Sequence, residues 1–502
     1  MIDKPRIGFY PMMQGFYNPP GDDFSGPGMV GIALLVLMAN IRIAQAEAPP
    51  PKDPPIQERN PCIEYLSKDK PKVQETGGPC SPGGETTKAP KLTYRRQSLE
   101  DQDPTSISGN PGADNILTGT GWLGQQLGLA EDSGVRLGGL WVGNADIQMS
   151  GRLSGSASFN SLGIIDLLLD MKTLAGIHGG TFSATFLQFD GQPSNGRAGV
   201  LTGYNGLTGV APLNRSELYE MWWRQTLFDE HLIVRVGKSV PTFDFNNVSR
   251  RLPIPDEKPF VAAVSGLLFT PIFVNPSVLG VLPGYYNSAW GMTVTATPSA
   301  HGYLSYGIYD GSLARGRQTG THAWPTFDSY YFNIGEAGIS WDGRYPGKAA
   351  VGGWGQSGWM GASPHRESGA QGVFATATNR LLNLNVEEGT TGVLLGYVQY
   401  GINNSKTMLA NQYVGFGVTG INLLPSRPKD SMGLGLGVSW LNNPPRGGET
   451  EILTQMYYQA HVVGDIFFQP TFTYVPNPGK PTNDGGQYPA ATSMIFQIVT
   501  LF

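Results

Sequence analysis

Residues 431–441 of this 502-residue chain read SMGLGLGVSWL, and apolar side chains alternate there with glycine and serine. Successive side chains of a β-strand point to opposite faces of the sheet. One face would therefore carry Met432, Leu434, Leu436, Val438 and Trp440, and the other Gly433, Gly435, Gly437 and Ser439. The pattern predicts a strand with one continuously apolar face and one nearly empty face, so that the two faces meet different surroundings.

The same period of two recurs in YVGFGVTG (413–420), QMYYQAHV (455–462) and FFQPTFTYV (467–475). A soluble sandwich also alternates, but its outward face is polar and charged. Only 15 % of this chain is charged, against about 25 % in soluble domains. The sequence therefore predicts an all-β fold, a transmembrane antiparallel β-barrel of about 16 strands between Val135 and Phe502, with lipid outside and water inside. A soluble secreted β-sandwich is the alternative.

Residues 1–46 are predicted to form the signal-peptide region. Met29–Ala39 is an apolar run, shorter than the roughly 20 residues that a membrane-spanning helix requires. The small-x-small sequence Ala44-Gln45-Ala46 that follows is typical of a cleavage site. The long stretch before Met29 indicates either an over-extended start or an unusually long segment ahead of the apolar core.

Residues 47–115 are rich in proline and glycine, a composition that buries too little apolar surface to fold alone. We expect a flexible, disordered periplasmic extension that serves as a tether, a partial plug or a contact with another envelope protein. It contains Cys62 and Cys80, which form one disulfide if the compartment is oxidising and stay unpaired thiols otherwise. The barrel domain then occupies residues 116–502 and opens with a short helix over residues 122–131.

Catalytic motifs are missing from the sequence. It contains no G-x-S-x-G, H-E-x-x-H or C-x-x-C, and its six histidines show no metal-ligand spacing. Gly415-x-Gly417-x-x-Gly420 spells a dinucleotide fingerprint but lies within an alternating strand instead of opening a helix. The net charge of −5 argues against a nucleic-acid partner. We therefore expect neither an enzyme nor a cofactor or metal site.

The segment ELYEMWWRQTLFDEHLIVRVGK (217–238) is the most informative one for function. If Asp229 and Glu230 form a two-residue turn, Arg224 lies directly across from Arg235, and the outward pairs are Leu227 with Leu232, Gln225 with Val234 and Trp223 with Val236. The lumen face would then carry Glu220, Trp222 and Arg224 together with Arg235. Asp244, Arg250 and Arg251 follow the second strand and belong either to the same group or to a loop.

Such a group is suited to binding a sugar. Guanidinium groups donate paired hydrogen bonds to neighbouring hydroxyls, carboxylates accept them, and an aromatic face stacks on the ring's C–H groups. We therefore predict that Glu220, Trp222, Arg224, Arg235 and Asp244 contact the permeating solute. The alternative is a structural ion cluster that stiffens the barrel wall.

The sequence resembles the carbohydrate-selective porins of the OprB family. The resemblance runs from about Gly121 to Phe502 through GWLGQQLGLAEDSGVRLGG, WWRQTL, LIVRVGKSVPTFDF, LPGYYNSAWGMTVTATPSAHGYLSYGIYDG, GVLLGYVQYGINN and GETEILTQMYYQAHVVGDIFFQPTFTYVPNPG. It implies a sixteen-stranded barrel in the bacterial outer membrane that admits monosaccharides, glucose above all, by diffusion without energy coupling. A general or other-solute porin on the same barrel is the first alternative, and an outer-membrane hydrolase the second.

The final segment, SMIFQIVTLF, places Met494, Phe496, Ile498, Thr500 and Phe502 on one side of a strand. An unpaired strand edge is not tolerated in lipid, so this strand is expected to pair with the first one and close the barrel. The terminal Phe502 is similar to the signal by which barrel-assembly machinery recognises outer-membrane barrels. We therefore assign Phe502 to assembly and expect outer-membrane lipid, that machinery and carbohydrate as partners.

Overall fold

In the computed structural model, the described part of the chain comprises residues 121–130, 132–208, 214–229, 231–248, 275–284, 287–315, 324–361, 365–387, 390–427, 430–446 and 448–502. The predicted signal-peptide region and the extension with Cys62 and Cys80 lie outside these residues, as do Arg250 and Arg251.

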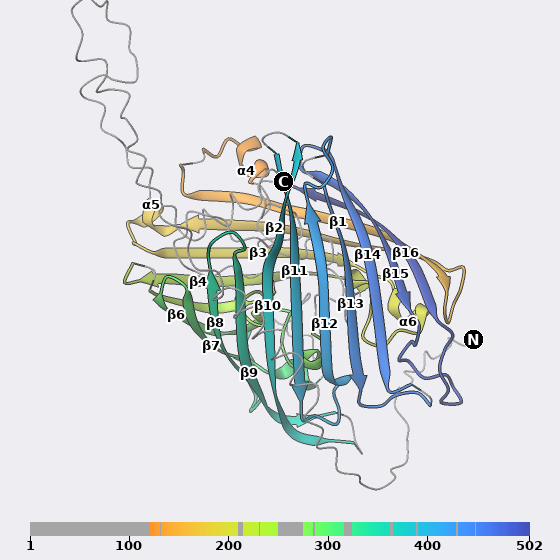
Figure 1. The fold of residues 1–502 in the computed structure, drawn as a ribbon. Helices are drawn as coiled ribbons and strands as arrows, with labels where there is room; N and C mark the ends of the chain where they lie inside the picture. Colours follow the sequence, from red (N-terminus) through yellow and green to blue (C-terminus); the bar gives the residue numbers. More distant parts are fainter. Residues whose placement is uncertain are drawn as a thin grey trace, which may run out of the picture. The chain divides into compact units, whose positions relative to one another are not determined.

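The described strands form one closed antiparallel barrel in which each strand pairs with its neighbours in sequence and β16 pairs with β1 (Figure 1). The sixteen strands are β1 (Val135–Ser150), β2 (Ala157–Asp170), β3 (Gly180–Asp190), β4 (Asn214–Leu227), β5 (Leu232–Ser239), β6 (Ala289–Ser299), β7 (Gly302–Asp310), β8 (Tyr331–Trp341), β9 (Gly347–Met360), β10 (Glu367–Glu387), β11 (Thr390–Asn403), β12 (Ala410–Ile421), β13 (Ser431–Leu441), β14 (Thr450–Val463), β15 (Ile466–Val475) and β16 (Ala491–Leu501). The predicted fold class and the closing pair are confirmed.

Among the residues that the structure describes, helices are few and short. They are α4 (Trp122–Gln126), α5 (Met171–Ala175) and α6 (Ser194–Ala198), with 3₁₀ turns η1 (Gly206–Thr208), η2 (Pro241–Phe243), η4 (Pro276–Val278) and η5 (Ser312–Arg315). The predicted opening helix is therefore present as α4 but ends at Gln126. No helix within the described residues is long and apolar enough to cross a membrane.

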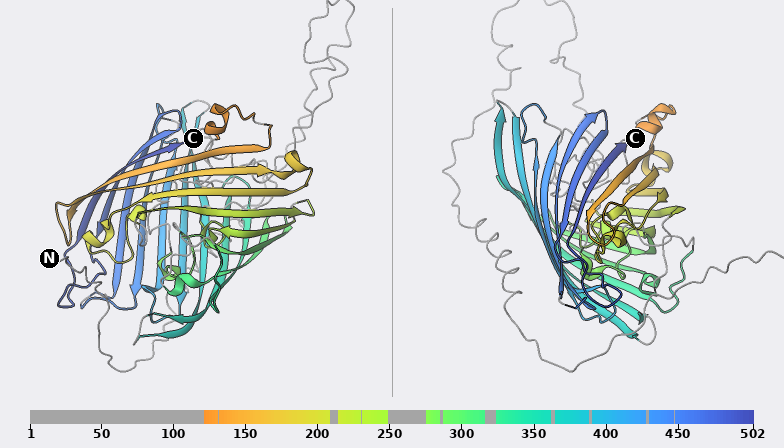
Figure 2. Two further views of the ribbon diagram at one scale, coloured as in Figure 1. Left: turned by 180° about the vertical axis from the view of Figure 1, so that it is seen from behind. Right: turned by 90° about the vertical axis from the view of Figure 1, so that its right-hand side faces the viewer.

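The two faces of the strands differ as their alternation predicts. On the outer face, Leu434, Met456 and Phe416 are 46, 48 and 49 % exposed. On the inner face, Gln455 and Thr473 are buried at 0 and 1 % exposure. Apolar side chains on the outer face and polar ones on the inner face are the arrangement of a membrane barrel. The views in Figure 2 show the sheet closing on itself, with the orange strand β1 beside the dark blue β16.

The glycine face of β12 and β13 is not empty, as the sequence pattern suggested, but covered by tyrosine rings. A Cβ atom at Gly417 would stand 2.6 Å from Cε1 of Tyr397, and one at Gly433 would stand 2.6 Å from Cε1 of Tyr457. Tyr397 and Tyr457 are each 4 % exposed. The glycines therefore make room for large rings on the inner wall, contributed by the adjacent strands β11 and β14.

The two rims of the barrel differ in the length of their connections. At the rim that holds the end of β16, residues 300–301 join β6 to β7, and residues 464–465 join β14 to β15. At the opposite rim, residues 191–213, 240–288 and 311–330 join β3 to β4, β5 to β6 and β7 to β8. Short turns on one side and long loops on the other are typical of outer-membrane barrels.

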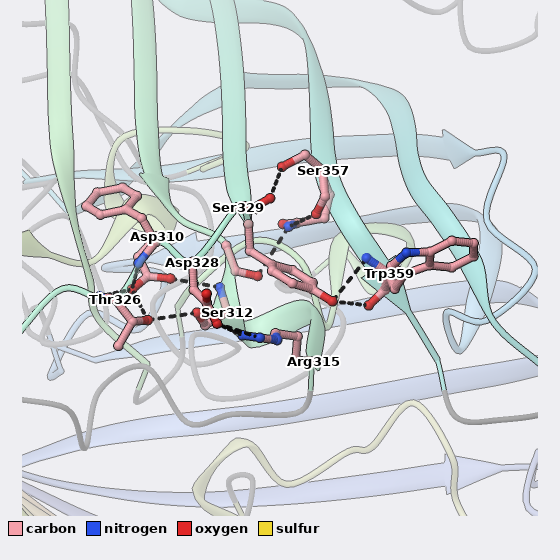
Figure 3. A network of polar contacts seen from close by, with 12 residues as sticks. Asp310, Ser312, Arg315, Thr326, Asp328, Ser329, Ser357 and Trp359 are labelled. Atoms are coloured by element: carbon pink, nitrogen blue, oxygen red, sulfur yellow. Dashed lines mark hydrogen bonds and ion pairs between the residues drawn. The ribbon is translucent and has the colours of Figure 1, made fainter.

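The connection from β7 to β8 is held at its rim by a polar network (Figure 3). The Asp310 carboxylate accepts hydrogen bonds from the backbone of Ser312 at 3.0 Å and from the backbone and hydroxyl of Thr326, both at 2.9 Å. Arg315 pairs with Asp328 at 2.7 Å. Hydrogen bonds and an ion pair near both ends of this connection therefore attach it to the barrel rim.

Candidate functional site

The hairpin of β4 and β5 has the predicted register. Arg224 pairs with Arg235, and Leu227 pairs with Leu232. The turn between the strands closes with a hydrogen bond of 3.1 Å from the His231 N–H to the Phe228 carbonyl. Asp229, the first central residue of this turn, has a φ of 52°, the left-handed conformation that the common two-residue hairpin turns require there. Phe228, which precedes it, has a φ of 55°.

The residues predicted to contact the solute are brought together on the inner wall. Arg235 forms an ion pair with Asp244, the residue that follows η2 in the connection from β5 to β6. The Arg235 guanidinium carbon lies 5.6 Å from the centre of the Trp222 ring, within the range of a cation–π contact. The Glu220 carboxylate accepts a 3.1 Å hydrogen bond from the backbone N–H of Val240. Arg224 is their neighbour through its pairing with Arg235.

A β-bulge in β4 extends this polar wall. The pairing of β3 with β4 steps from Thr185–Glu220 to Phe186–Leu218, which leaves Tyr219 as the extra residue. A bulge reverses the alternation beyond it, so Arg215 and Glu217 are buried on the inner face along with Glu220. Arg215 and Glu217 form an ion pair of 3.3 Å. This bulge was not predicted from the sequence, because no proline or glycine marks it.

Sequence analysis also missed the part of the site on β1, β2 and β3. Asp166 of β2 pairs with Thr185 of β3, which in turn pairs with Glu220 of β4. Asp166 lies near enough to Arg136 and to Glu220 to interact electrostatically with both. The available signal was Asp166 itself, an acidic residue within the otherwise apolar sequence LGIIDLLL. A lone charge at an inward position of a barrel strand indicates a lumen residue.

Two long connections fold against the inner wall. The first, 191–208, reaches from β3 back to β1, where the Tyr204 hydroxyl lies 2.8 Å from the Asp146 carboxylate. Burial and the neighbouring Asp146 raise the pKa of the Tyr204 hydroxyl above its ordinary value, so the hydroxyl stays protonated and can donate. The same connection reaches β14, where the backbone N–H of Thr202 donates to Glu451 at 2.7 Å.

The second connection leaves β5 and runs along the part of the inner wall that is formed by β8, β10 and β11. The backbone N–H of Asn246 donates to Glu336 of β8 at 2.7 Å, and the Thr378 hydroxyl of β10 donates to the Val248 carbonyl at 2.7 Å. Further along, the Asn403 side chain of β11 donates to the Ser277 carbonyl at 2.7 Å. The described parts of this connection thus carry Asp244 to Arg235 and are anchored on three other strands.

The chemistry of the site is that of reversible hydrogen bonding. It offers guanidinium donors, carboxylate acceptors and an indole face on one wall, but among the described residues no group of three or more His, Cys, Asp or Glu side chains could hold a metal ion. Carboxylates that are already paired with guanidinium groups are suited to orienting a neutral polyol, because such a solute exchanges hydrogen bonds with both partners.

Comparison with known proteins agrees with this architecture. The family model "Carbohydrate-selective porin, OprB family" matches residues 165–490. Among solved structures, OprB of Pseudomonas putida at high pH superposes with a TM-score of 0.63 at 17 % identity, covering 78 % of this chain and 100 % of that one. Its low-pH structure gives a TM-score of 0.48 at 15 % identity, covering 78 % and 99 %. Individually curated protein sequences gave no match.

The family match spans well over half of the chain and includes the whole of the β4–β5 hairpin and the inward connections. Porins of this family are channels without enzymatic activity, in agreement with the absence of a catalytic motif from the sequence. The chain belongs to the OprB family of carbohydrate-selective porins and is a β-barrel channel of the outer membrane.

Proposed function

We propose that this porin conducts monosaccharides, glucose among them, by passive diffusion, and that Glu220, Trp222, Arg224, Arg235 and Asp244 bind the sugar transiently as it passes. The observation that carries the proposal is the position of Arg235, between the Asp244 carboxylate and the face of Trp222. Charged hydrogen-bonding groups and an aromatic face thus meet at one point of the inner wall.

The placement of charges favours a neutral, hydroxylated solute over an ion. Arg215 is paired with Glu217, and Arg235 with Asp244. A sugar hydroxyl both donates and accepts, so it can bridge the two members of such a pair, whereas a pair of opposite charges offers neither an anion nor a cation a net attraction. Glu220 and Asp166 add two carboxylate acceptors to the same wall, in register with one another through Thr185.

The outer face supports a lipid environment around the barrel. Val351, Val373 and Leu304 are more than half exposed there, and apolar side chains on that face of a closed barrel are stable only against lipid. We propose that the short turns face the periplasm and the long connections the cell exterior, with Phe502 recognised by the barrel-assembly machinery.

The test is single-channel conductance of the refolded protein in a planar bilayer, titrated first with glucose and then with neutral amino acids. Saturable closure by glucose alone supports a sugar-binding pore. Ion current that no sugar reduces would assign the protein to the general porins. Closure by amino acids at the same concentrations would identify another class of solute.

A further inference from the structure

Two buried carboxylates on different strands hold neighbouring residues of the connection 191–208 against the inner wall. Asp146 belongs to β1, and Glu451 belongs to β14, which is separated from β1 by β15 and β16. Asp146 is 2 % exposed and Glu451 is 1 % exposed. The connection starts at β3, so reaching Glu451 requires it to pass β2, β1, β16 and β15.

Glu451 accepts more hydrogen bonds than Asp146 does. Its carboxylate accepts hydrogen bonds from the backbone N–H of Leu201 at 2.8 Å, from the backbone N–H of Thr202 at 2.7 Å and from the Thr202 hydroxyl. It also accepts from the backbone N–H of Gly479, in the connection between β15 and β16. Every donor is a neutral group of a connection, so the carboxylate joins two loops to one strand.

Asp146 supports the next residues of the connection. It accepts from the Tyr204 hydroxyl at 2.8 Å and from the Asn205 side chain at 3.2 Å, and it is also bonded to Ser493 of β16. Gln455, four residues after Glu451 on β14, donates to the Tyr204 carbonyl at 2.9 Å. Residues 201–205 are thereby fixed on both sides, and Val200, Tyr204 and Leu207 pack in the apolar cluster of the inner wall.

We propose that Glu451, together with Asp146, is a positioning residue that sets the aperture of the pore by holding residues 199–205 across the inner wall. The role rests on the proposed function and deepens it, because a narrower lumen would bring a passing sugar closer to the polar wall of β4 and β5. A carboxylate suits this task since it accepts hydrogen bonds through both oxygens and offers no donor of its own.

The substitution Glu451→Gln tests the proposal with almost no change in size. It replaces one acceptor oxygen by an NH₂ group that faces N–H and O–H donors, so at least one set of the loop's hydrogen bonds is lost. We expect the single-channel conductance to rise and its single level to split into several interconverting levels. The matched control is Glu367→Gln, because Glu367 likewise accepts from the backbone of Lys406 at 2.9 Å and from the Thr407 hydroxyl at 2.6 Å, but in the six-residue connection 404–409.

A second variant distinguishes loss of the contact between the connection and the wall from misfolding of the barrel. Thr202→Val removes a donor from the connection and leaves the barrel strands untouched, so heat-modifiable gel mobility should be preserved and conductance should change in the same direction. Conductance equal to the parent's in both Glu451→Gln and Thr202→Val would overturn the proposal, as would an equal change in Glu367→Gln. Ion conductance is recorded without sugar. A parent channel that no sugar closes would therefore reject the sugar-binding function, while the aperture result would stand on its own.

Discussion

Arg224 on β4 and Arg235 on β5 lie directly opposite one another on the inner wall of the barrel. Like charges in such a pair destabilise a sheet by roughly 0.2–1 kcal/mol. Here the cost is offset, because Asp244 forms an ion pair with Arg235 and the Glu220 carboxylate lies close enough to attract the same guanidinium. Under the proposed function, this pair of cations contacts the permeating sugar.

Replacing Arg224 by alanine should weaken sugar block without unfolding the barrel. Arg224 is partly exposed and its side chain is not needed for the backbone ladder. Loss of a charge-assisted hydrogen bond to a sugar hydroxyl is worth roughly 1.5–3 kcal/mol, or about a tenfold to hundredfold rise in the blocking concentration. The measurement is glucose-dependent closure in a planar bilayer, with Arg344→Ala in the exposed turn after β8 as the control. Unchanged block with unchanged conductance would place Arg224 among the structural residues.

Substituting Asp244 by asparagine should make the channel more selective for anions. The change removes the ion-pair partner of Arg235 and leaves Glu220 alone to offset its guanidinium on the inner wall. Unscreened positive charge attracts anions and repels cations over about 10 Å at 0.1 M salt. The reversal potential across a KCl gradient should shift accordingly and approach the parent value at high salt. An exposed aspartate at a turn, Asp342, provides the control variant Asp342→Asn. A reversal potential equal to the parent's would remove Asp244 from the permeation path.

The barrel strands and the β4–β5 hairpin were predictable because both depend on residues that are close together in the sequence. Period-two alternation assigns each strand its faces, and a two-residue turn at Asp229 and Glu230 fixes the pairing of Arg224 with Arg235 by counting. The bulge at Tyr219 was not predictable in this way. It depends on how β3 and β4 accommodate one extra residue, which leaves no pattern within either strand.

The inward connections were not predicted either, and the reason is their sequence separation. Glu451 binds Leu201 across 250 positions, and Ser493 meets Asp146 across 347. Within its own strand, Glu451 fits the period-two pattern in the same way as any other inward polar residue. Only closure of the barrel brings β14 and β1 onto the path of the β3–β4 connection. The tyrosine rings over the glycine face escaped prediction for a related reason, because each ring comes from the adjacent strand.

Deleting Phe502 should lower the amount of assembled barrel. Its backbone N–H and carbonyl exchange hydrogen bonds of 2.9 and 2.8 Å with Gly139 at the seam between β16 and β1. Phe502→Ala keeps these two bonds and removes only the ring. If the ring is recognised during assembly, both variants should reduce the heat-modifiable form in outer-membrane fractions. A defect confined to the deletion would assign the effect to the seam alone, and normal levels of both would refute the assembly role.

Alanine at Gly417 should destabilise the barrel, whereas alanine at Gly355 should not. A Cβ atom at Gly417 would meet Cε1 of Tyr397 at 2.6 Å and the backbone oxygen of Leu434 at 2.7 Å, so the ring and the strand would have to move. Such overpacking costs about 1–3 kcal/mol. At Gly355 nothing lies within 4 Å of the added atom, and lost freedom of the unfolded chain stabilises by about 0.4–1 kcal/mol. The midpoint of urea unfolding in lipid vesicles, followed by heat-modifiable mobility, should therefore fall for Gly417→Ala and hold or rise for Gly355→Ala. Equal midpoints for the two variants would show that the tyrosine rings can leave the glycine face at no cost.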